Sequence, residues 1–134
     1  MEKHQTRLRV RYAETDQMGV VYHSNYLIWM ELGRTEYCRA RGVRYRDMEA
    51  ADGIWLAVVD AHCRYASPAR YDDEIVVTTR IALANRRVVE FAYELCSDTG
   101  RAIATGETKH VFLGANLRPT SLPEKYYALF GIQS

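Results

Sequence analysis

Apolar and polar residues alternate near the start of the chain and then change to a helical spacing. Residues 7–12 alternate arginine with Leu, Val and Tyr, which predicts a strand with one buried face. A helix is predicted over residues 24–41, with Gly42 as the residue that ends it. Residues 26–30 are apolar on every side, which is typical of a helix surrounded by protein. Gly33 costs this helix about 1 kcal/mol relative to alanine, so we expect another stretch of backbone to approach closely there.

After the helix, the pattern changes to strands. Four segments are rich in Val, Ile, Thr, Tyr and Phe and are separated by turn residues: 54–65, 74–83, 86–96 and 102–113. The last three are predicted to form an antiparallel meander. Residues 121–124 are typical of a capping box that opens a short helix ending at Phe130. Strands this long must twist and curl, so the chain is predicted to be one α+β domain over residues 1–134, with a curled five-stranded antiparallel sheet around a long central helix.

The candidate chemistry lies where the first strand passes into the helix. Asp16 stands in a polar loop seven residues before His23, Gly19 permits a positive φ in that loop, and Ser24 or His23 can serve as the N-cap of the helix. The first N–H groups of a helix lack intrahelical acceptors and point beyond its end. With the helix dipole, they can stabilise a carbonyl oxygen that becomes an oxyanion. An ionised aspartate beside them can attack that carbonyl or activate water, so the pair suits the hydrolysis of an activated ester.

A longer motif contains these residues. It comprises Tyr12, Thr15-Asp16, Gly19-Val20-Val21-Tyr22-His23, Asn25-Tyr26, Glu31 and Arg34-Thr35-Glu36, followed by Pro68 to Glu74. The motif resembles the 4-hydroxybenzoyl-CoA thioesterase family of the hotdog fold, most closely its bacterial branch that includes the Tol-Pal-associated acyl-CoA thioesterases. The resemblance covers nearly the whole chain.

The resemblance implies an acyl-CoA thioesterase that needs no cofactor, since CoA is part of the substrate. The family's catalytic acid falls on Asp16, either as nucleophile or as general base. The backbone N–H that polarises the thioester carbonyl falls on His23, whose imidazole is expected only to pack or to form a hydrogen bond. The resemblance also implies a homo-oligomer, a dimer or more commonly a tetramer, with pockets between subunits. Exposed sheet edges, which natural proteins usually cover, favour the same expectation.

Four further residues are candidates for substrate binding. Tyr22 is expected to line the site. Glu31 lies in an apolar stretch, where a carboxylate needs a partner or a function. In the hydroxybenzoyl-CoA enzymes an acidic residue at this position receives the phenolic hydroxyl, but an ion pair with Arg64 or Arg70 explains Glu31 equally well. Because the chain resembles the broad-range bacterial branch more than the dedicated aryl enzymes, we lean toward the structural role. Arg86 and Arg87 follow a predicted turn and are candidates for the CoA phosphates, although exposed charges at a hairpin are usually only solvated.

Composition narrows the classes of partner and compartment. The chain has 134 residues, a formal net charge of +1 and three widely spaced cysteines. A charge near zero gives no general field for nucleic acid, and we expect none as a partner. The cysteine number and spacing argue against a disulfide framework and a Cys-x-x-Cys metal site, so no metal is expected. We find neither a signal-peptide pattern nor an apolar run long enough for a membrane span, which favours a cytoplasmic protein.

Two rival functions remain open. A hotdog dehydratase would use a histidine together with an acid on hydroxyacyl thioesters, and His23 near Asp16 offers such a pair. A non-catalytic acyl-CoA-binding domain would bind the same ligand without turnover. Free thiol release, hydration of an enoyl thioester, and binding alone distinguish the three.

Overall fold

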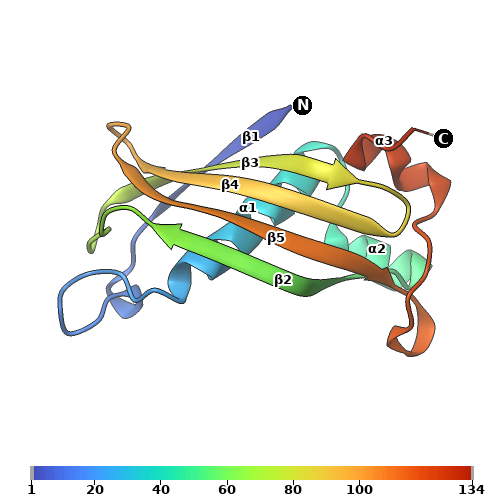
Figure 1. The fold of residues 1–134 in the computed structure, drawn as a ribbon, viewed down its shortest axis with the longest axis horizontal. Coiled ribbons are helices and arrows are strands. Elements are labelled where there is room, and N and C mark those ends of the chain that lie inside the picture. The colour runs from blue at the N-terminus through green and yellow to red at the C-terminus, as the bar shows by residue number, and fades with distance from the viewer. Residues whose placement is uncertain (1, 134) are drawn as a thin grey trace.

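One long helix lies inside a single curved sheet (Figure 1). The computed structural model describes residues 2–133. The strands are β1 (Lys3–Arg9), β2 (Trp55–Tyr65), β3 (Glu74–Ala84), β4 (Val88–Ser97) and β5 (Ala102–Leu113), and the helices are α1 (Asn25–Ala40), α2 (Tyr45–Asp52) and α3 (Tyr127–Phe130). Every strand pairs antiparallel to its neighbours in the order β1-β3-β4-β5-β2. The predicted α+β hotdog architecture and the β3-β4-β5 meander are therefore confirmed.

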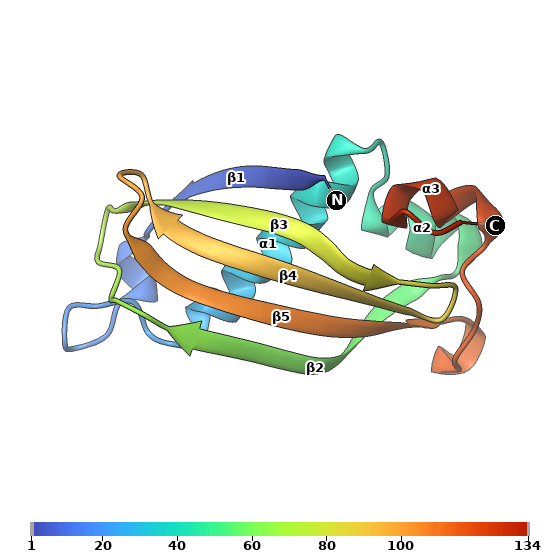
Figure 2. The same cartoon turned by 45° about the horizontal axis from the view of Figure 1, so that its top comes forward.

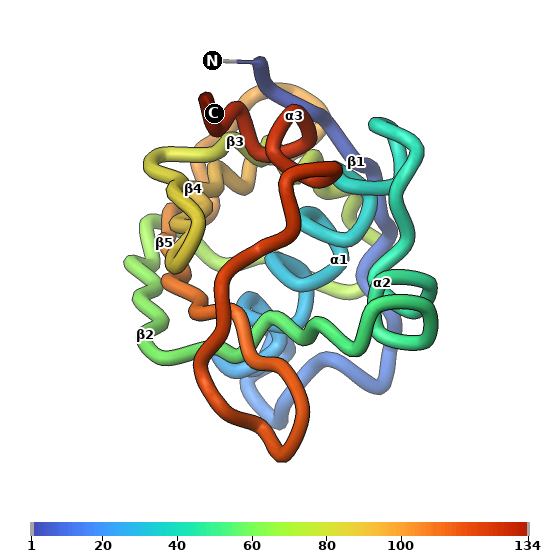
Figure 3. The backbone as a smooth tube through the Cα atoms, turned by 90° about the vertical axis from the view of Figure 1, so that its right-hand side faces the viewer, coloured from blue at the N-terminus to red at the C-terminus, as the bar shows by residue number. Residues whose placement is uncertain are grey.

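The sheet curls enough to enclose one side of α1. Its pairing shifts register between β2 and β5, between β3 and β4, and between β4 and β5, and such irregularities increase local twist. Figure 2 shows the strands bending across the helix, and the end view in Figure 3 shows α1 inside the curve. β1 and β2 are the two edges of this sheet, so each has one side without a strand partner among residues 2–133.

Helix α1 packs against the sheet through one face. Tyr26, Trp29, Met30 and Tyr37 are buried there. Gly33 lies between them, and a Cβ at this position would come within 2.5 Å of Thr79 Oγ1 and 2.8 Å of a Val77 methyl carbon. The predicted close approach at Gly33 is correct, but the approaching atoms are side chains of β3, not backbone.

The opposite face of α1 corrects the expectation that the helix is surrounded by protein. Leu27, Ile28 and Leu32 are all exposed, with Ile28 at 53% of its full accessibility. One chain has a single sheet and can cover only one side of a helix. The apolar residues on the other side are left as an open stripe.

Three other features of the structure differ from the sequence prediction. Tyr12, predicted to point inward from the first strand, lies in a short 3-10 helix and is 77% exposed, because β1 ends at Arg9. Helix α2 has no counterpart in the sequence prediction, since Met48 is the one buried residue it contributes and no apolar stripe marks it. At the C-terminus, the capping box is wrong: Pro123 is the N-cap of a 3-10 turn and provides no side-chain cap.

Candidate active site

The loop before α1 is a closed hairpin. An isolated bridge joins Thr15 to Val21, and the Asp16 amide donates to the Val20 carbonyl at 2.9 Å. At its tip, Gly19 has a φ of +78° and donates its N–H to the Asp16 carbonyl at 2.9 Å. This left-handed conformation is the one predicted for Gly19, and it favours glycine because other residues have a Cβ that crowds the backbone. The position of Asp16 is therefore fixed by backbone bonds on both sides.

The Asp16 carboxylate uses one of its oxygens inside this loop. Oδ1 accepts the Met18 N–H at 2.9 Å, as in a typical Asx turn. No other side-chain hydrogen bond or ion pair within residues 2–133 engages the half-buried carboxylate. The turn holds the side chain in place and leaves the second oxygen free to react or to bind water.

The start of α1 is held by backbone and by one asparagine. Ser24 is the N-cap of α1, as one of the two predicted alternatives, but it has helical backbone angles and its side chain makes no capping bond. Instead, the Asn25 N–H donates to the Tyr22 carbonyl at 3.0 Å, and Asn25 Nδ2 donates to the Glu14 carbonyl at 2.9 Å. These bonds fix the end of the helix against the loop that carries Asp16.

The backbone amides of His23 and Ser24 are the free donors at this end. Tyr22 donates its N–H to the Glu14 carbonyl, and Val21 donates to Ala69. Within residues 2–133, neither His23 nor Ser24 donates its N–H to any protein acceptor. Free N–H groups at the start of a 16-residue helix attract negative charge, because the dipole adds to their own partial charge.

A small hollow lies beside these amides. Its volume is about 290 Å³, and Val21, His23, Tyr26, Tyr65 and Pro68 are among its lining residues. The Tyr65 hydroxyl donates to the His23 carbonyl at 3.2 Å, which ties the end of β2 to the start of α1. Tyr22 is half-exposed, with its ring centre 4.4 Å from that of the His23 imidazole. The structure thus places Tyr22 and His23 side by side, while Asp16 lies in the preceding hairpin with no hydrogen bond to His23.

Glu14 is a part of this region that the sequence analysis missed. It is buried, with 5% exposure, and both carboxylate oxygens are bonded. Oε1 accepts the Arg11 N–H at 2.8 Å, and Oε2 accepts the indole N–H of Trp29 at 2.8 Å. The Glu14 carbonyl also receives the bonds from Tyr22 and Asn25 described above. One residue therefore joins the loop to the first two turns of α1.

The charge on Glu14 is stabilised despite burial. Burial on its own would raise the pKa of the Glu14 carboxyl, but hydrogen bonds from the Arg11 amide and the Trp29 indole outweigh it and hold the pKa below its ordinary value. A buried indole N–H usually needs an acceptor. The clue to Glu14 in the sequence was therefore Trp29. A tryptophan on the buried face of a helix needs an acceptor for its indole N–H, and Glu14 provides it.

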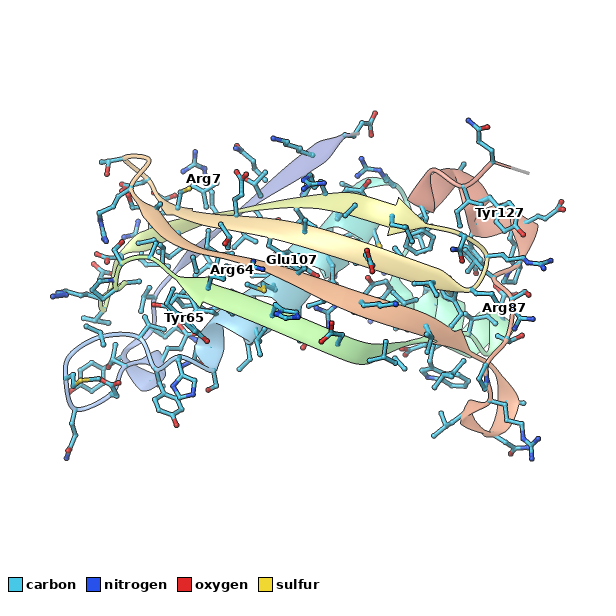
Figure 4. The ribbon with its side chains drawn as sticks, in the orientation of Figure 1. Arg7, Arg64, Tyr65, Arg87, Glu107 and Tyr127 are labelled. Carbon is cyan, nitrogen blue, oxygen red and sulfur yellow. The ribbon has the colours of Figure 1, made fainter. Side chains whose placement is uncertain are left out.

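Glu31 does not form either ion pair considered for it. Arg64 donates to both oxygens of Glu107, at 3.2 and 2.9 Å, and Figure 4 shows this pair on the outer face of the sheet. No ion pair among residues 2–133 joins Glu31 to Arg70 or to any other cation. Glu31 is exposed on α1, at the rim of a cavity between α1, α2 and β2. The structural explanation by Arg64 or Arg70 is therefore wrong for the single chain.

Arg86 and Arg87 lie far from the Asp16 loop. Both are exposed at the β3–β4 turn, where the Arg87 N–H donates to Asn85 Oδ1 at 2.8 Å. Figure 4 shows Arg87 and Tyr65 at opposite ends of the sheet, and Tyr65 marks the end where His23 lies. A single chain does not bring these arginines to the His23 amide.

Among residues 2–133, no group of three or more His, Cys, Asp and Glu side chains is arranged to hold a metal ion. In the same range, no helix has the length and apolar character needed to cross a bilayer.

Comparisons with known proteins agree with this architecture. Residues 10–130 match the family model described as the thioesterase-like superfamily. YneP of Bacillus subtilis is 40% identical over 78% of this chain and 75% of its own length, and the acyl-CoA thioesterase YbgC of Haemophilus influenzae is 30% identical over 92% and 90%. The crystal structure of a DHNA-CoA thioesterase from Staphylococcus aureus superposes with a TM-score of 0.89, at 32% identity over 96% of this chain and 85% of that one. The chain therefore belongs to the thioesterase-like superfamily and has its hotdog fold.

Proposed function

We propose that this protein is an acyl-CoA thioesterase, which hydrolyses acyl-CoA to a free acid and CoA. The observation that carries the proposal is the free His23 amide at the start of α1, which lies beside a hollow and directly after the Asp16 hairpin. An N–H in this position suits the oxyanion that forms when a thioester carbonyl is attacked. The names of the YbgC relative and of the superposed structure support the same reaction for this chain.

In the proposed reaction, the thioester carbonyl oxygen accepts the His23 N–H. As nucleophile, Asp16 attacks the carbonyl carbon, CoA leaves as the thiolate, and water hydrolyses the mixed anhydride to regenerate the carboxylate. As general base, Asp16 takes a proton from water, and the water oxygen attacks instead. Both routes use an ionised carboxylate with a free oxygen, and neither requires a metal or redox cofactor.

We further propose that the complete site needs two copies of the chain. β2 is an open edge of the sheet, with Val58 and Val59 more than half exposed. If two β2 strands pair antiparallel about a twofold axis, the Trp55 end of one strand lies beside the Tyr65 end of the other. Arg86 and Arg87 of one protomer then come to the same end of the dimer as the other protomer's His23, which allows them to bind CoA phosphates. A tetramer would also cover the open apolar stripe on α1.

Three finer points, the role of Tyr22, the branch of the family and the cellular location, also belong to the proposal. The Tyr22 ring lies beside the His23 imidazole, and Tyr22 is proposed to contact the substrate. Membership of the Tol-Pal-associated branch and a cytoplasmic location remain predictions.

A screen for free thiol decides the proposed function. Purified protein is given short, long, branched and aromatic acyl-CoAs, and release of CoA is followed with a thiol reagent. Release from at least one class at catalytic rates supports a thioesterase. Hydration of an enoyl thioester without thiol release would replace it by the dehydratase, and acyl-CoA binding without any turnover would replace it by a binding domain.

A further inference from the structure

An arginine of the β4–β5 turn is attached to the wall of the hollow beside His23. Arg101 Nη1 donates to Ser67 Oγ at 2.7 Å and to the Pro68 carbonyl at 3.0 Å. Ser67 and Pro68 both line that hollow. Figure 1 shows the β4–β5 turn at the same end of the sheet as the loop before α1. The fold therefore brings the Arg101 guanidinium to the edge of the candidate active site of its own chain.

The wall itself is held in place from two sides. The N–H groups of Ala66 and Ser67 both donate to the Ile103 carbonyl, at 2.8 and 3.2 Å. On the other side, Val21 donates its N–H to the Ala69 carbonyl at 2.8 Å. This segment is thus fixed both to β5 and to the loop that precedes α1, and the guanidinium bound to it has a defined position. A preorganised donor loses less conformational freedom when a ligand binds.

Part of the Arg101 guanidinium has no acceptor in the described chain. The residue is exposed, and within residues 2–133 its side-chain hydrogen bonds are those from Nη1 alone. A guanidinium carries further N–H donors on Nε and Nη2, and these are left over. No ion pair within residues 2–133 includes Arg101, whereas Arg64 on β2 donates to both oxygens of Glu107. Arg101 therefore has charge and hydrogen-bonding capacity available for a ligand.

The charge of Arg101 also acts inside the hollow. Tyr26 is a buried residue that lines it. Burial raises the pKa of the Tyr26 phenol above its ordinary value, and the positive charge of Arg101 opposes this rise. The effect agrees with the hydrogen bonds to Ser67 and Pro68. The guanidinium lies close enough to act on a molecule bound in the hollow.

The chemistry of Arg101 fits one part of an acyl-CoA better than the other. The CoA handle, meaning the part of the substrate beyond the sulfur, carries amide carbonyl and phosphate oxygens that accept hydrogen bonds from a guanidinium. A plain acyl chain has no acceptor beyond the thioester carbonyl. Arg101 is exposed at the rim of the hollow, and a large polar handle must leave the site toward solvent.

We propose that Arg101 binds the CoA handle of the substrate whose thioester lies at the His23 amide of the same chain, through an amide carbonyl or a phosphate oxygen. This inference rests on the thioesterase function proposed above. It does not depend on Arg86 and Arg87, because a single chain does not bring the β3–β4 turn to this site. Arg101 holds the handle from its own protomer and so anchors the substrate next to the reacting carbonyl.

The test uses one acyl group on handles of decreasing length: CoA, pantetheine, N-acetylcysteamine and propanethiol. Thiol release is measured for wild type and Arg101→Gln. We expect Arg101→Gln to lower kcat/KM for the acyl-CoA by about tenfold, mainly through KM, because a charged hydrogen bond to the substrate is lost. The propyl thioester has neither amide nor phosphate, so its hydrolysis should stay within about twofold of wild type.

The intermediate handles show which oxygen Arg101 contacts. A loss confined to the acyl-CoA assigns the contact to a phosphate, and a loss that persists with pantetheine or N-acetylcysteamine assigns it to an amide carbonyl. Either result supports the inference. An equal loss on every handle, the propyl thioester included, would overturn it, because Arg101 would then only support the wall. An unchanged kcat/KM for the acyl-CoA would overturn it as well.

Arg80→Gln is the matched control, because it makes the same change in net charge. Arg80 is exposed on β3, outside the lining of the hollow, and no ion pair within residues 2–133 includes it. This variant should stay within about twofold of wild type on every handle. A loss equal to that of Arg101→Gln would trace the effect to net charge and contradict a direct contact.

Calorimetry with free CoA separates this inference from the proposed function. CoA is titrated into wild-type and Arg101→Gln protein, so no turnover is needed. A CoA affinity that falls about tenfold in Arg101→Gln supports the inference even if no thioester is hydrolysed, in which case only the proposed function fails. Thiol release from acyl-CoA with the same CoA affinity and the same kcat/KM in both proteins overturns the inference and leaves the function untouched.

Discussion

The two ends of helix α1 differ in how their polar groups are paired. At the start, Glu14 is buried and both of its carboxylate oxygens accept hydrogen bonds, while the unpaired donors are backbone amides that face a hollow. Toward the other end, Arg34 has no carboxylate partner in the described chain and the Tyr45 hydroxyl is buried without one. A fully paired network fixes geometry, whereas an unpaired polar group adds no such constraint. The first end is thus arranged to hold reacting atoms still, and the second is held by fewer polar contacts.

The largest expected effect tests the reacting end. Asp16→Asn should lower kcat by several orders of magnitude, because an amide is neither nucleophile nor base. The new side-chain oxygen can still accept the Met18 N–H, so the hairpin should keep its shape. Steady-state thiol release measures the loss, and calorimetry should show acyl-CoA affinity close to wild type.

Asp98→Asn is the matched control, since Asp98 is an exposed residue in the turn between β4 and β5. It should retain full activity. Near wild-type turnover of Asp16→Asn would remove Asp16 from the mechanism.

The next effect separates backbone from side chain at His23. His23→Pro deletes the N–H and should cost about 10²- to 10³-fold in kcat, the range for loss of one oxyanion donor. His23→Ala keeps the donor and should lose about tenfold or less. A loss in His23→Ala as large as in Asp16→Asn would instead make the imidazole a principal catalyst. Circular dichroism of both variants verifies that α1 is intact.

The elements that follow from strong periodic patterns were predictable from the sequence. The α1 prediction over 24–41 matches Asn25–Ala40 closely, and Gly42 has the expected positive φ of +85°. The strands beyond residue 54 agree with β2 to β5 within about two residues, because alternation and turn residues act locally. α2 was missed because a helix that buries only Met48 carries no stripe.

The site was predictable only in part, because its geometry depends on contacts distant in sequence. The positive φ of Gly19 and the N-cap at Ser24 agree with the expectation, since both depend on neighbouring residues. The roles of Asp16 and His23 remain predictions. Glu14 was missed because its role depends on Trp29, fifteen residues away. Arg86 and Arg87 were assigned without knowing that a single chain places the β3–β4 turn, and with it Arg87, at the other end of the sheet. Spacing along a sequence does not reveal which end of a strand faces which loop.

A prediction of smaller effect tests whether the hydrogen bonds to Glu14 hold the start of α1 in place. Glu14→Gln replaces an acceptor-only carboxylate with an amide that faces two donors, so one buried N–H loses its acceptor. We expect a loss of about 1–3 kcal/mol in the free energy of unfolding, measured by urea denaturation. Glu36→Gln, in an exposed pair with Arg39 on α1, should change stability little.

The same substitution should alter the dependence of stability on pH. Because the folded pKa of Glu14 lies below its ordinary value, its contribution is present above that value and is lost as the pH falls through the folded pKa. Wild type should therefore lose more stability than Glu14→Gln between neutral and acidic pH. Parallel acid profiles of the two proteins would show that the Glu14 charge does not stabilise the fold.

The smallest expected effect concerns Glu31, which lies between the two ends of α1. An ion pair and a contact to a substrate hydroxyl explained Glu31 equally well from the residues, and only the likeness to the bacterial branch leaned toward a uniform effect of Glu31→Gln on all substrates. The described chain provides no ion pair for Glu31. Glu31 instead borders the cavity that contains Arg34 and Tyr45. An acyl hydroxyl that donates to a carboxylate gains roughly 1.5–3 kcal/mol. We therefore expect Glu31→Gln to lower kcat/KM about tenfold for a hydroxylated acyl-CoA and to leave its plain counterpart unchanged. The measurement is thiol release from the matched pair, with Glu36→Gln as the control on the same helix. An equal loss on both substrates would return Glu31 to a structural role.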